Sequence, residues 1–583
     1  MLNLKSIKFT IFFVVLFVLS SCEGDALLSN TFVDTSSDIN SSVDLRVPHI
    51  TLNPSDSDSD MDYIPDSLER LQGRDPFNPD ENNNSIKDGL EGDPFFPYQW
   101  YIYSRSDDII CNTAHIETIK GNDLDIMPLY HYTLGNNNGT QTIQVVDGGI
   151  DKHPDIDLDI NNSINSINNT LDPTPTEGFS TNPTQIFYRG HGTAVAGIIG
   201  ARGFNNIGIR GIAPTVKIAG SNWLESEDIS KLDEVWCADN NITISNNSWG
   251  TKFIDDFSYE TIMEKASNEL RDGRGRIFVF AGGNEREEFS NANLSYLLNN
   301  PYSITVSAIN HKNQYASYST AGSNILVSAY GGEHYYSAPT IFTTFTPNHT
   351  MSESELMDSK GPITIDEDTN RSYTYAMNGS SAAAPMVSGA LALVLDMCPS
   401  LSWRDIRWLI ALSSTKIDEN NSEWITNSFS LSHNNNYGFG RINPLGMVEI
   451  CLSPDYKNLP KQIKSEITID YESIIPDNNQ SVEKLFIIDR DMQIDWVGLT
   501  VTLDHKFAGD IEIELVSPSG TISHIIDKNF INFNAYKDGF RFSTVSLMGE
   551  RSKGVWRVKI RDALLDDRGV LKRLKLEIRG YDL

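Results

Sequence analysis

Three short segments of this 583-residue chain each place one side chain suited to nucleophilic catalysis among small residues. In chain order these side chains are Asp147 before two glycines, His191 between two glycines, and Ser381 before three alanines and a proline. A serine hydroxyl is a weak nucleophile, so it needs an imidazole that takes its proton and a carboxylate that holds this imidazole in the correct tautomer. Each segment alone is more typical of a turn, a loop histidine or a helix start, but the three together predict a catalytic triad for acyl transfer.

The elements around these side chains predict how they reach one site. An apolar run ending at Asp147 indicates a buried strand whose carboxyl end delivers the carboxylate into a crevice. Small residues after His191 and Ser381 indicate two helices, and Pro385 is expected in the first turn of the second helix. Ser381 should therefore stand at a helix N-terminus, where backbone N–H groups favour developing negative charge.

On these segments the chain resembles the subtilase family, whose triad has the same order of Asp, His and Ser. From about Trp100 to the C-terminus it is most similar to the kexin/furin branch, which joins a catalytic domain to a P domain. The resemblance implies that Asn284, in a Gly-Asn turn after an apolar strand, donates a hydrogen bond to the oxyanion. It also implies that Ser248, Trp249 and Gly250 belong to a strand that pairs with the substrate backbone, although Trp249 alone would be interpreted as a core tryptophan.

Two positions depart from the pattern by which the kexin branch binds basic substrate residues. Gly148 stands where that branch has a second Asp, and Asn293 aligns with an acidic residue of its primary pocket. A neutral amide cannot form a bidentate charged pair with arginine. Asp255 and Asp256 could restore an acidic rim or could simply be solvated, so the sequence leaves basic specificity open.

The remaining pattern predicts an α/β domain followed by an all-β domain. Apolar strand-like runs alternate with helical patterns in the first, and short strands with period-two alternation follow in the second. The resemblance implies a subtilisin-like three-layer α/β/α catalytic domain with a mostly parallel sheet, and a jelly-roll-like P domain that supports the catalytic fold. The expected segments are a signal peptide at 1–21, a flexible tether at 22–55, calcium-binding repeats at 56–98, the catalytic domain at 99–455 and the P domain at 464–583.

The N-terminus predicts export. Lys5 and Lys8 precede an apolar run from about Phe9 to Leu19, which is too short for a permanent membrane span and typical of a signal-peptide core. The run leads to Cys22, and this segment resembles the bacterial lipobox, in which the cysteine becomes lipid-modified. We therefore expect a lipoprotein anchored to a membrane of the bacterial cell envelope or surface, with an ordinary secretory signal as the alternative.

Two aligned acidic repeats precede the catalytic domain. Ca²⁺ takes about six to eight hard oxygen ligands, which alternate residues of a tight loop supply. The repeats resemble thrombospondin type 3 repeats, with Tyr63 and Ser85 where an EF-hand loop has glycine; an acidic disordered linker is the alternative. The predicted ligands are Asp58, Asp60, Asp62, the Ile64 carbonyl, Asp66 and Glu69 in the first loop, and Asp80, Asn82, Asn84, the Ile86 carbonyl, Asp88 and Glu91 in the second.

The resemblance implies one more calcium site, inside the catalytic domain. Asp155 and Asn206 match positions that ligate a structural calcium in many subtilases. The local spacing in this chain differs from the family's by about one residue. A Pro-Asp turn and an Asn-rich loop without metal remain the alternative.

Composition restricts the partners. The chain has 78 acidic and 46 basic residues and a net charge of −32, which argues against nucleic acid and is compatible with calcium sites or an acidic, solvated surface. The subtilase resemblance implies protein or peptide substrates. Besides Cys22 there are four cysteines, which allow three connectivities of two disulfides. They are Cys111, Cys237, Cys398 and Cys451.

Two other functions remain to be weighed against a peptidase. A catalytically silent, calcium-dependent surface binding or adhesion protein could keep the protease scaffold, but drift would be expected to damage at least one of the four catalytic positions. An esterase is a more remote alternative, because the expected substrate strand around Trp249 favours peptides over small esters. The sequence therefore favours a serine endopeptidase that works through an acyl-enzyme.

Overall fold

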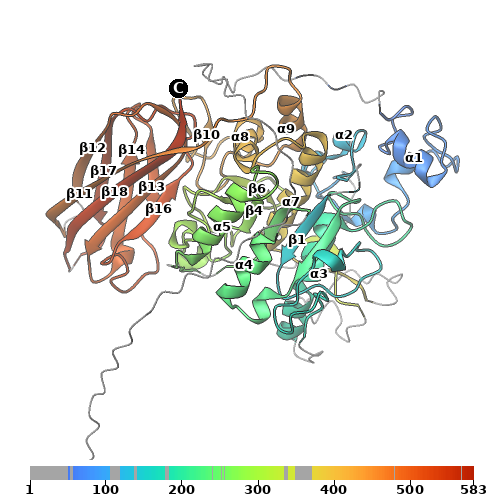
Figure 1. Ribbon diagram of the computed structural model, residues 1–583, viewed down its shortest axis with the longest axis horizontal. Coiled ribbons are helices and arrows are strands. Elements are labelled where there is room, and N and C mark those ends of the chain that lie inside the picture. Colours follow the sequence, from blue (N-terminus) through green and yellow to red (C-terminus); the bar gives the residue numbers. More distant parts are fainter. Residues whose placement is uncertain are drawn as a thin grey trace, which may run out of the picture. The chain divides into compact units, whose positions relative to one another are not determined.

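The computed structural model describes most of the chain (Figure 1). The described residues are 50, 52, 57–105, 118–136, 139, 141–176, 183–238, 241–250, 252–254, 256–333, 339–347, 371–477, 480–565 and 567–583. They belong to one compact unit, Ser42–Leu583. The predicted signal peptide and nearly all of the tether lie outside the described residues, as do Cys22, Cys111 and Asp255.

A parallel six-stranded sheet forms the centre of the first domain, in the order β2-β1-β3-β4-β5-β6. Because β1, β4, β5 and β6 are buried at every position, helices or loops must cover both faces, which explains the apolar runs at β1 and β4 in the sequence. The strands of this domain are β1 (Thr142–Val146), β2 (Lys217–Ser221), β3 (Ile242–Asn247), β4 (Ile277–Ala281), β5 (Ser303–Ile309) and β6 (Val327–Tyr330), with the antiparallel pairs β7 (Ile341–Thr344) and β8 (Tyr373–Met377), and β9 (Ile425–Thr426) and β10 (Ser432–His433).

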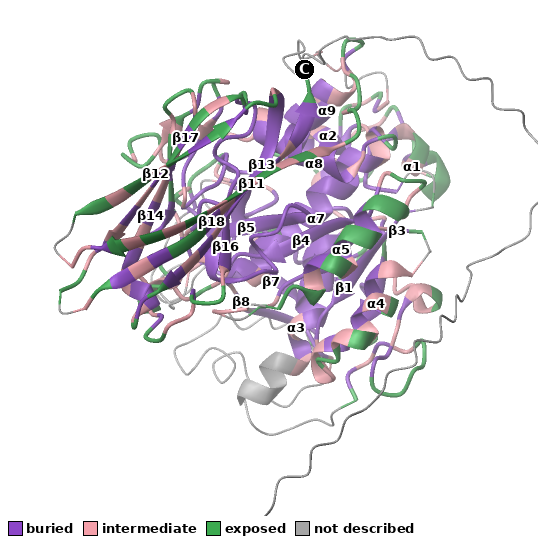
Figure 2. Ribbon diagram, turned by 60° about the vertical axis from the view of Figure 1, so that its left-hand side comes forward, coloured by how far each residue is buried: buried purple, intermediate pink, exposed green. Residues whose placement is uncertain are grey.

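Helices pack on this sheet and on one another. One long helix, α7, lies along β3 to β6 and contacts α3, whereas Trp236 of α4 packs against Phe278 and Phe280 of β4. Figure 2 shows the sheet and α7 buried, while α4 and α5 expose part of their surface. The described helices are α1 (Asp66–Gln72), α2 (Met127–Tyr130), α3 (Pro183–Gly200), α4 (Ile229–Cys237), α5 (Ser258–Glu269), α7 (Ser380–Met397), α8 (Trp403–Ser413) and α9 (Pro444–Cys451).

The helix α7 is apolar enough to span a membrane by length and composition. Its 18-residue window has a mean hydropathy of 1.4, but 83% of that window is buried inside the protein. It is therefore the core helix of the first domain. Within the described part of the chain, no second helix passes the same test.

The second domain consists of two antiparallel sheets of four strands, β11-β18-β13-β16 and β12-β17-β14-β15. Inward and outward residues alternate along β14 and β17, as period-two patterning predicts for a sheet with one face on a core. The all-β second domain is thus confirmed. Its strands are β11 (Ile463–Ile475), β12 (Ser481–Ile488), β13 (Met492–Asp504), β14 (Ile511–Val516), β15 (Ile522–Ile526), β16 (Phe540–Thr544), β17 (Gly554–Asp562) and β18 (Gly569–Asp582).

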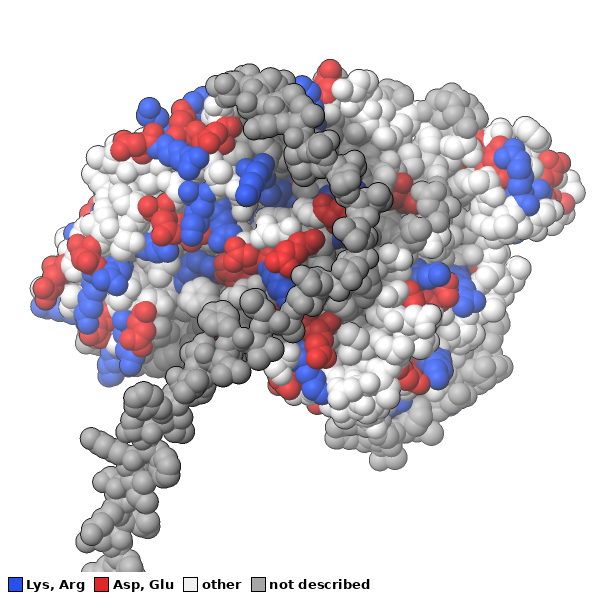
Figure 3. Space-filling model, in the orientation of Figure 1, with Lys and Arg blue, Asp and Glu red and all other residues white. Residues whose placement is uncertain are grey.

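Charges of both signs lie side by side on the visible surface of the β domain (Figure 3). Cross-strand pairs between the edge strand β11 and its neighbour β18 include Asp470 with Arg573 at 2.6 Å and Glu466 with Lys575 at 3.1 Å. Exposed pairs of this kind contribute little to stability. Charged side chains on an edge strand do, however, discourage pairing with a strand of another molecule.

Side-chain amides of the first domain bind the backbone of the β domain. The Asn299 amide nitrogen donates to the carbonyl of Arg541 at 2.8 Å, and that of Asn427 donates to the carbonyls of Ser546 and Met548 at 2.9 and 2.8 Å. Such bonds satisfy backbone groups that the contact removes from water. The two domains therefore share one hydrogen-bonded interface.

One disulfide is present among the described residues. Cys398 at the end of α7 is bonded to Cys451 at the end of α9, across 53 residues of sequence. Cys237 is a free thiol. The structure thereby selects one of the pairings that the sequence left open.

Candidate active site

The carboxylate and the imidazole of the predicted triad are in contact. Asp147 follows β1 directly and is only 1% exposed. Its oxygens Oδ1 and Oδ2 lie 3.0 and 2.9 Å from Nδ1 of His191, which belongs to α3. A Cβ on Gly192 would lie 2.1 Å from the carbonyl oxygen of Gly149, so this glycine lets α3 approach the loop after β1. The predicted pairing of Asp147 with His191 is confirmed.

The contact with Asp147 raises the pKa of His191. Burial disfavours the charged imidazolium, but the charge of Asp147 and its hydrogen bond outweigh burial, so the pKa of His191 is raised above its ordinary value. With Nδ1–H donated to Asp147, Nε2 is the basic nitrogen of the neutral ring. A general base needs this stabilisation once it has taken a proton.

Ser381 is the second residue of α7 and follows the N-cap residue Gly379 by two positions. Its hydroxyl donates to the carbonyl oxygen of Ser248 at 3.0 Å, and the Ser248 hydroxyl donates to the carbonyl oxygen of Ser381 at 3.0 Å. This reciprocal pair of bonds joins the predicted nucleophile to the expected substrate strand.

Pro385 lies in the second turn of α7 and not in the first, which corrects the expectation from sequence. A proline inside a helix offers no N–H to the carbonyl four residues earlier, which here belongs to Ser381. The hydroxyl of Ser248 donates to that carbonyl instead. The position of the proline thus explains why Ser248 can bind the backbone of α7.

Asn284 follows β4 at the same end of the sheet and is held by the residue before the predicted nucleophile. Its Oδ1 accepts from the backbone N–H of Ser380 at 2.8 Å and from the Ser380 hydroxyl at 3.0 Å. The Ser380 hydroxyl also accepts from the N–H of Gly283 at 3.1 Å. Because these bonds fix the oxygen end of the amide, its NH₂ end is available as a donor, as an oxyanion hole requires. Sequence reasoning missed this role of Ser380.

Trp249 is packed as a core tryptophan. Its ring centroid lies 4.8 Å from that of Trp223, and it stacks on Trp236 at 6.2 Å. Its indole N–H donates to the carbonyl of Val146 at 2.8 Å, one residue before Asp147. The side chain of Trp249 therefore anchors the segment of Ser248 and Gly250 to β1, and backbone pairing with a substrate stays a prediction.

Asn293 does not line a substrate pocket, so the expectation for this residue is wrong. It is completely buried, and its amide nitrogen donates to the Ser323 hydroxyl at 2.9 Å and to the carbonyl of Ile525 at 3.1 Å. Its Oδ1 accepts from the N–H of Ser543 at 2.7 Å. Two of these partners belong to the β domain, so the polar atoms of Asn293 serve the domain interface and are not available to a substrate residue.

Residues 138–440 of the chain match the model of the subtilase family. The chain belongs to the subtilase family. Residues 494–578 of this subtilase match the proprotein convertase P-domain, which covers the strands from β13 to β18. The family and P-domain resemblance seen in the sequence is confirmed.

Relatives and solved structures agree with this assignment. The subtilase is 28% identical over 543 residues to the Aeromonas extracellular serine protease of Aeromonas sobria, covering 80% of this chain and 84% of that protein. It is 27% identical to kexin of Saccharomyces cerevisiae over 80% of this chain, but it spans only 54% of kexin. The crystal structure of the Aeromonas sobria serine protease has a TM-score of 0.73 and 25% identity, covering 86% of this chain and 99% of that one. The subtilase is a serine endopeptidase.

The first acidic loop of the subtilase contains buried carboxylate oxygens that have no hydrogen-bond partner among the described residues. Asp58, Asp60 and Asp62 each offer an oxygen within 4.8 Å of the others. Within the described residues, Oδ2 of Asp60, Oδ2 of Asp62 and both oxygens of Glu69 are buried without a hydrogen-bond partner. Burial, together with neighbouring carboxylates, raises the pKa of Asp62 to about 7 and that of Glu69 to about 8. A hard divalent cation fits this set of oxygens.

Both acidic loops share one backbone conformation. Residues at the fourth and sixth positions have positive φ in each loop: 65° and 83° for Met61 and Tyr63, and 59° and 73° for Asn83 and Ser85. The first Asp of each loop accepts N–H groups from these turns. The sixth position thus needs a glycine-like conformation although neither loop has glycine there, and a bulky residue is strained in it.

The second acidic loop offers less negative charge to a cation. It has Asn at two positions where the first loop has Asp. The amide nitrogens of Asn82 and Asn84 donate to the two carboxylate oxygens of Glu91 at 2.8 and 2.6 Å. Because affinity for Ca²⁺ rises with the number of charged ligands, the first loop is the stronger candidate.

Arg210 attaches the acidic repeats to the catalytic domain. It is completely buried and forms an ion pair of 2.9 Å with Asp93, directly after the second loop. It also donates to the carbonyls of Gly89 and Glu91 at 2.7 and 2.8 Å. At the other loop, Asp58 contacts Nδ1 of His131 at 2.5 Å. The repeats are therefore part of the folded domain and not a separate spacer.

The calcium site at Asp155 and Asn206 stays a prediction. The oxygens of Asp155 accept hydrogen bonds from the amide of Asn205 at 2.9 Å, from the N–H of Ile209 at 3.0 Å and from the hydroxyl of Tyr373 at 3.2 Å. Asn206 is exposed and has a φ of 61°. Three hydrogen-bond donors thus bind the Asp155 carboxylate in this structure.

Proposed function

We propose that this subtilase is an exported, lipid-anchored and calcium-dependent serine endopeptidase that cleaves peptide bonds through an acyl-enzyme. The observation that carries the catalytic part is the contact of 2.9 Å between His191 Nδ1 and Asp147. The amide of Asn284, held through Ser380 beside Ser381, supplies the matching oxyanion donor. Acyl transfer by a serine hydroxyl requires both a carboxylate–imidazole contact and an oxyanion donor.

The proposed reaction uses each of these groups at a stated atom. Ser381 Oγ attacks the carbonyl carbon of the scissile bond while Nε2 of His191 takes its proton, and Asp147 stabilises the resulting imidazolium. The NH₂ group of Asn284 and the N–H of Ser381 bind the oxyanion, since N–H groups in the first turn of a helix have no partner within it. His191 then protonates the leaving amine, and water releases the acyl group by the reverse route.

Cleavage of a mixed peptide library by the purified protein tests the peptidase and its specificity. We expect cleavage in the presence of calcium, with cut sites identified by mass spectrometry. Arginine or lysine before most cut sites would show that residues other than Asn293 provide basic specificity. A folded, calcium-loaded protein that cleaves no peptide would contradict the proposal and favour a binding protein.

Export and anchoring are supported by two separate observations. The signal-like segment ends at Cys22, and the Cys398–Cys451 disulfide is typical of an oxidising compartment. Replacing Cys22 by Ser is expected to move the protein from the membrane fraction to the soluble fraction of a bacterial host. Cys237→Ser is the matched control and should stay in the membrane fraction. A Cys22→Ser protein that still sediments with membranes would refute the lipid anchor.

Calcium dependence is supported by the unneutralised oxygens of the first acidic loop. A chelator is therefore expected to lower both the unfolding temperature and the peptidase activity. At a free calcium concentration of about 100 times the Kd, one site stabilises the native state by about 2.7 kcal/mol. Because Arg210 and His131 join the loops to the catalytic domain, this stabilisation should reach the active site. Thermal unfolding scans in calcium and in chelator measure it.

A charge-removing variant locates the calcium effect. Glu69→Gln should reduce the calcium-dependent rise in unfolding temperature, because it removes a buried ligand charge. Glu472→Gln, at an exposed position of β11, is the matched control and should keep the full rise. Equal unfolding temperatures of the unmodified protein in calcium and in chelator would exclude a structural calcium site.

A further inference from the structure

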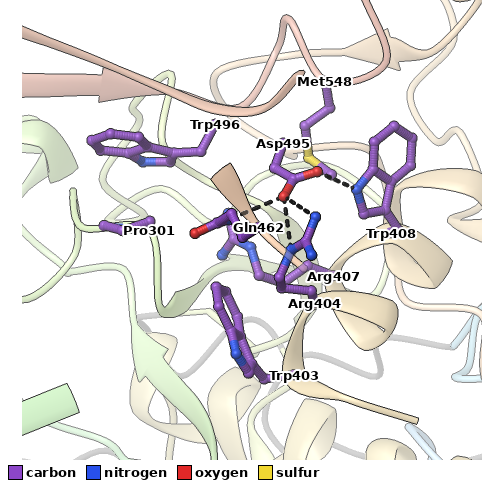
Figure 4. Close-up of a pocket in the computed structure, with 9 residues that line it drawn as sticks. All are labelled: Pro301, Trp403, Arg404, Arg407, Trp408, Gln462, Asp495, Trp496 and Met548. Carbon is purple, nitrogen blue, oxygen red and sulfur yellow. Dashed lines mark hydrogen bonds and ion pairs between the residues drawn. The ribbon is translucent and has the colours of Figure 1, made fainter. Parts of the chain in front are cut away.

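A small cavity lies between the catalytic domain and the β domain (Figure 4). Its volume is about 10 Å³, which leaves room for one species of about the size of a water molecule. Arg404 and Arg407 of α8 line one side, and Asp495 and Trp496 of β13 line the other. Both arginines and the aspartate are more than nine-tenths buried. The charges around this cavity are therefore scarcely screened by solvent.

Asp495 accepts hydrogen bonds from residues other than Arg407. Its Oδ2 lies 2.6 Å from Nη2 of Arg404 and accepts from Arg404 Nε at 2.9 Å and from Gln462 at 3.0 Å. Its Oδ1 accepts from the indole N–H of Trp408 at 2.8 Å. The dashed lines in Figure 4 join Asp495 to these three residues, and none reaches Arg407. Asp495 therefore neutralises Arg404.

Among the described residues, Arg407 is a buried cation without a carboxylate partner of its own. Its residue exposure is 4%, and the hydrogen bond that it makes within the described residues runs from Nη1 to the carbonyl of Ser303. A guanidinium carries five N–H donors, so most of them are left for a ligand. Burial lowers the pKa of Arg407 to about 10, although the negative charge of Asp495 acts to raise it. The guanidinium is still charged at neutral pH.

Neighbouring acidic groups do not supply the missing charge. Trp496 separates the cavity from Arg541 and Arg579, whose guanidinium carbons lie 5.5 and 5.7 Å from its ring centroid. Glu260 is paired with Arg541 at 2.5 Å, and Glu577 is paired with Arg579 at 2.7 Å. Two arginines and one aspartate thus leave the cavity with one uncompensated positive charge, which is costly in a buried site.

We propose that this cavity binds one monatomic monovalent anion of the size of chloride, beside Arg407 and between the two domains. An anion compensates the charge, whereas a water molecule in the same place does not. Polyatomic anions such as sulfate or gluconate are too large for a cavity of this volume. Because residues of both α8 and β13 line the cavity, an anion that neutralises Arg407 there would favour the folded state in which the two domains associate.

Bromide identifies the occupant directly, because it has the charge of chloride and a strong anomalous signal. In crystals of the full chain grown in bromide, we expect an anomalous peak within hydrogen-bond distance of the Arg407 guanidinium. A water molecule without anomalous signal, or an empty cavity, at high bromide concentration would overturn the proposal. This experiment needs no variant, so it does not depend on the folding of a mutant.

Thermal unfolding tests whether the anion binds in solution. At equal ionic strength we expect the unfolding temperature to be several degrees higher in sodium chloride than in sodium gluconate, with saturation as chloride replaces gluconate. Arg407→Gln should lose this difference, while Arg573→Gln, an exposed arginine of β18, should keep it. Equal unfolding temperatures of the unmodified protein in the two salts would overturn the proposal, as would a difference that Arg407→Gln retains.

Discussion

Replacing Ser381 by alanine is expected to lower the turnover of a peptide substrate by about 10⁶-fold, the loss known for subtilisin, which belongs to the same family. The substitution removes the nucleophile, so the acyl-enzyme cannot form. It should preserve the fold, because alanine is the best helix former and the Ser381 hydroxyl contributes one hydrogen bond, to Ser248. The measurement is kcat/KM on a fluorogenic peptide together with the unfolding temperature.

A serine outside the site separates catalysis from stability. Ser414, which follows α8, donates its hydroxyl to the carbonyl of Ile410 at 2.7 Å. Ser414→Ala should therefore keep full activity with a small change in unfolding temperature. If Ser381→Ala retained more than about one hundredth of the activity, Ser381 would not be the nucleophile.

Replacing Asn284 by alanine is expected to lower kcat by about 10²–10³-fold with little change in KM. This range is the one measured for the oxyanion-hole asparagine of subtilisin itself, a member of the same family. The physical reason is that the Asn284 NH₂ group bonds to charge that develops only in the transition state. Steady-state kinetics on one peptide substrate separate the effect on kcat from that on KM.

Asn293 provides the contrasting asparagine. Its amide bonds to the backbone of Ile525 and Ser543 in the β domain, so Asn293→Ala should lower stability by about 1–3 kcal/mol and leave kcat nearly unchanged. The unfolding temperature and kcat of both variants are measured side by side. An unchanged kcat of Asn284→Ala would show that Asn284 is not an oxyanion donor. A changed preference for basic peptides in Asn293→Ala would contradict the buried position of that residue.

The sequence was sufficient where function depends on local patterns. An apolar run ending at Asp147 predicted a buried strand, and the structure places that strand and the following carboxylate against His191. The alternation at Ile511–Leu515 in β14 likewise predicted a sheet with one buried face. These features depend on neighbouring residues in the chain, so they can be interpreted without the tertiary structure.

The predictions failed where the deciding contacts are distant in sequence. The side chain of Asn293 forms hydrogen bonds with the backbone of Ile525 and Ser543, more than 200 residues away. No local sequence pattern around Asn293 predicts these contacts. Alignment with a family pocket therefore assigned it the wrong surroundings. At Asp155 the amide of Asn205 and the N–H of Ile209 bind the carboxylate, contacts that no local sequence pattern indicated.

The interior proline of α7 has a consequence for how substrate and nucleophile are aligned. Pro385 has no N–H, so the carbonyl of Ser381, the predicted nucleophile, lacks the hydrogen bond from the residue four positions later in α7. The Ser248 hydroxyl, from the segment expected to bind the substrate, donates a hydrogen bond to that carbonyl. This hydrogen bond thus fixes the position of α7 relative to the segment around Ser248, although the two are far apart in the chain. If Ser381 is the nucleophile and this segment pairs with the substrate, Pro385 helps to align the two before a substrate binds.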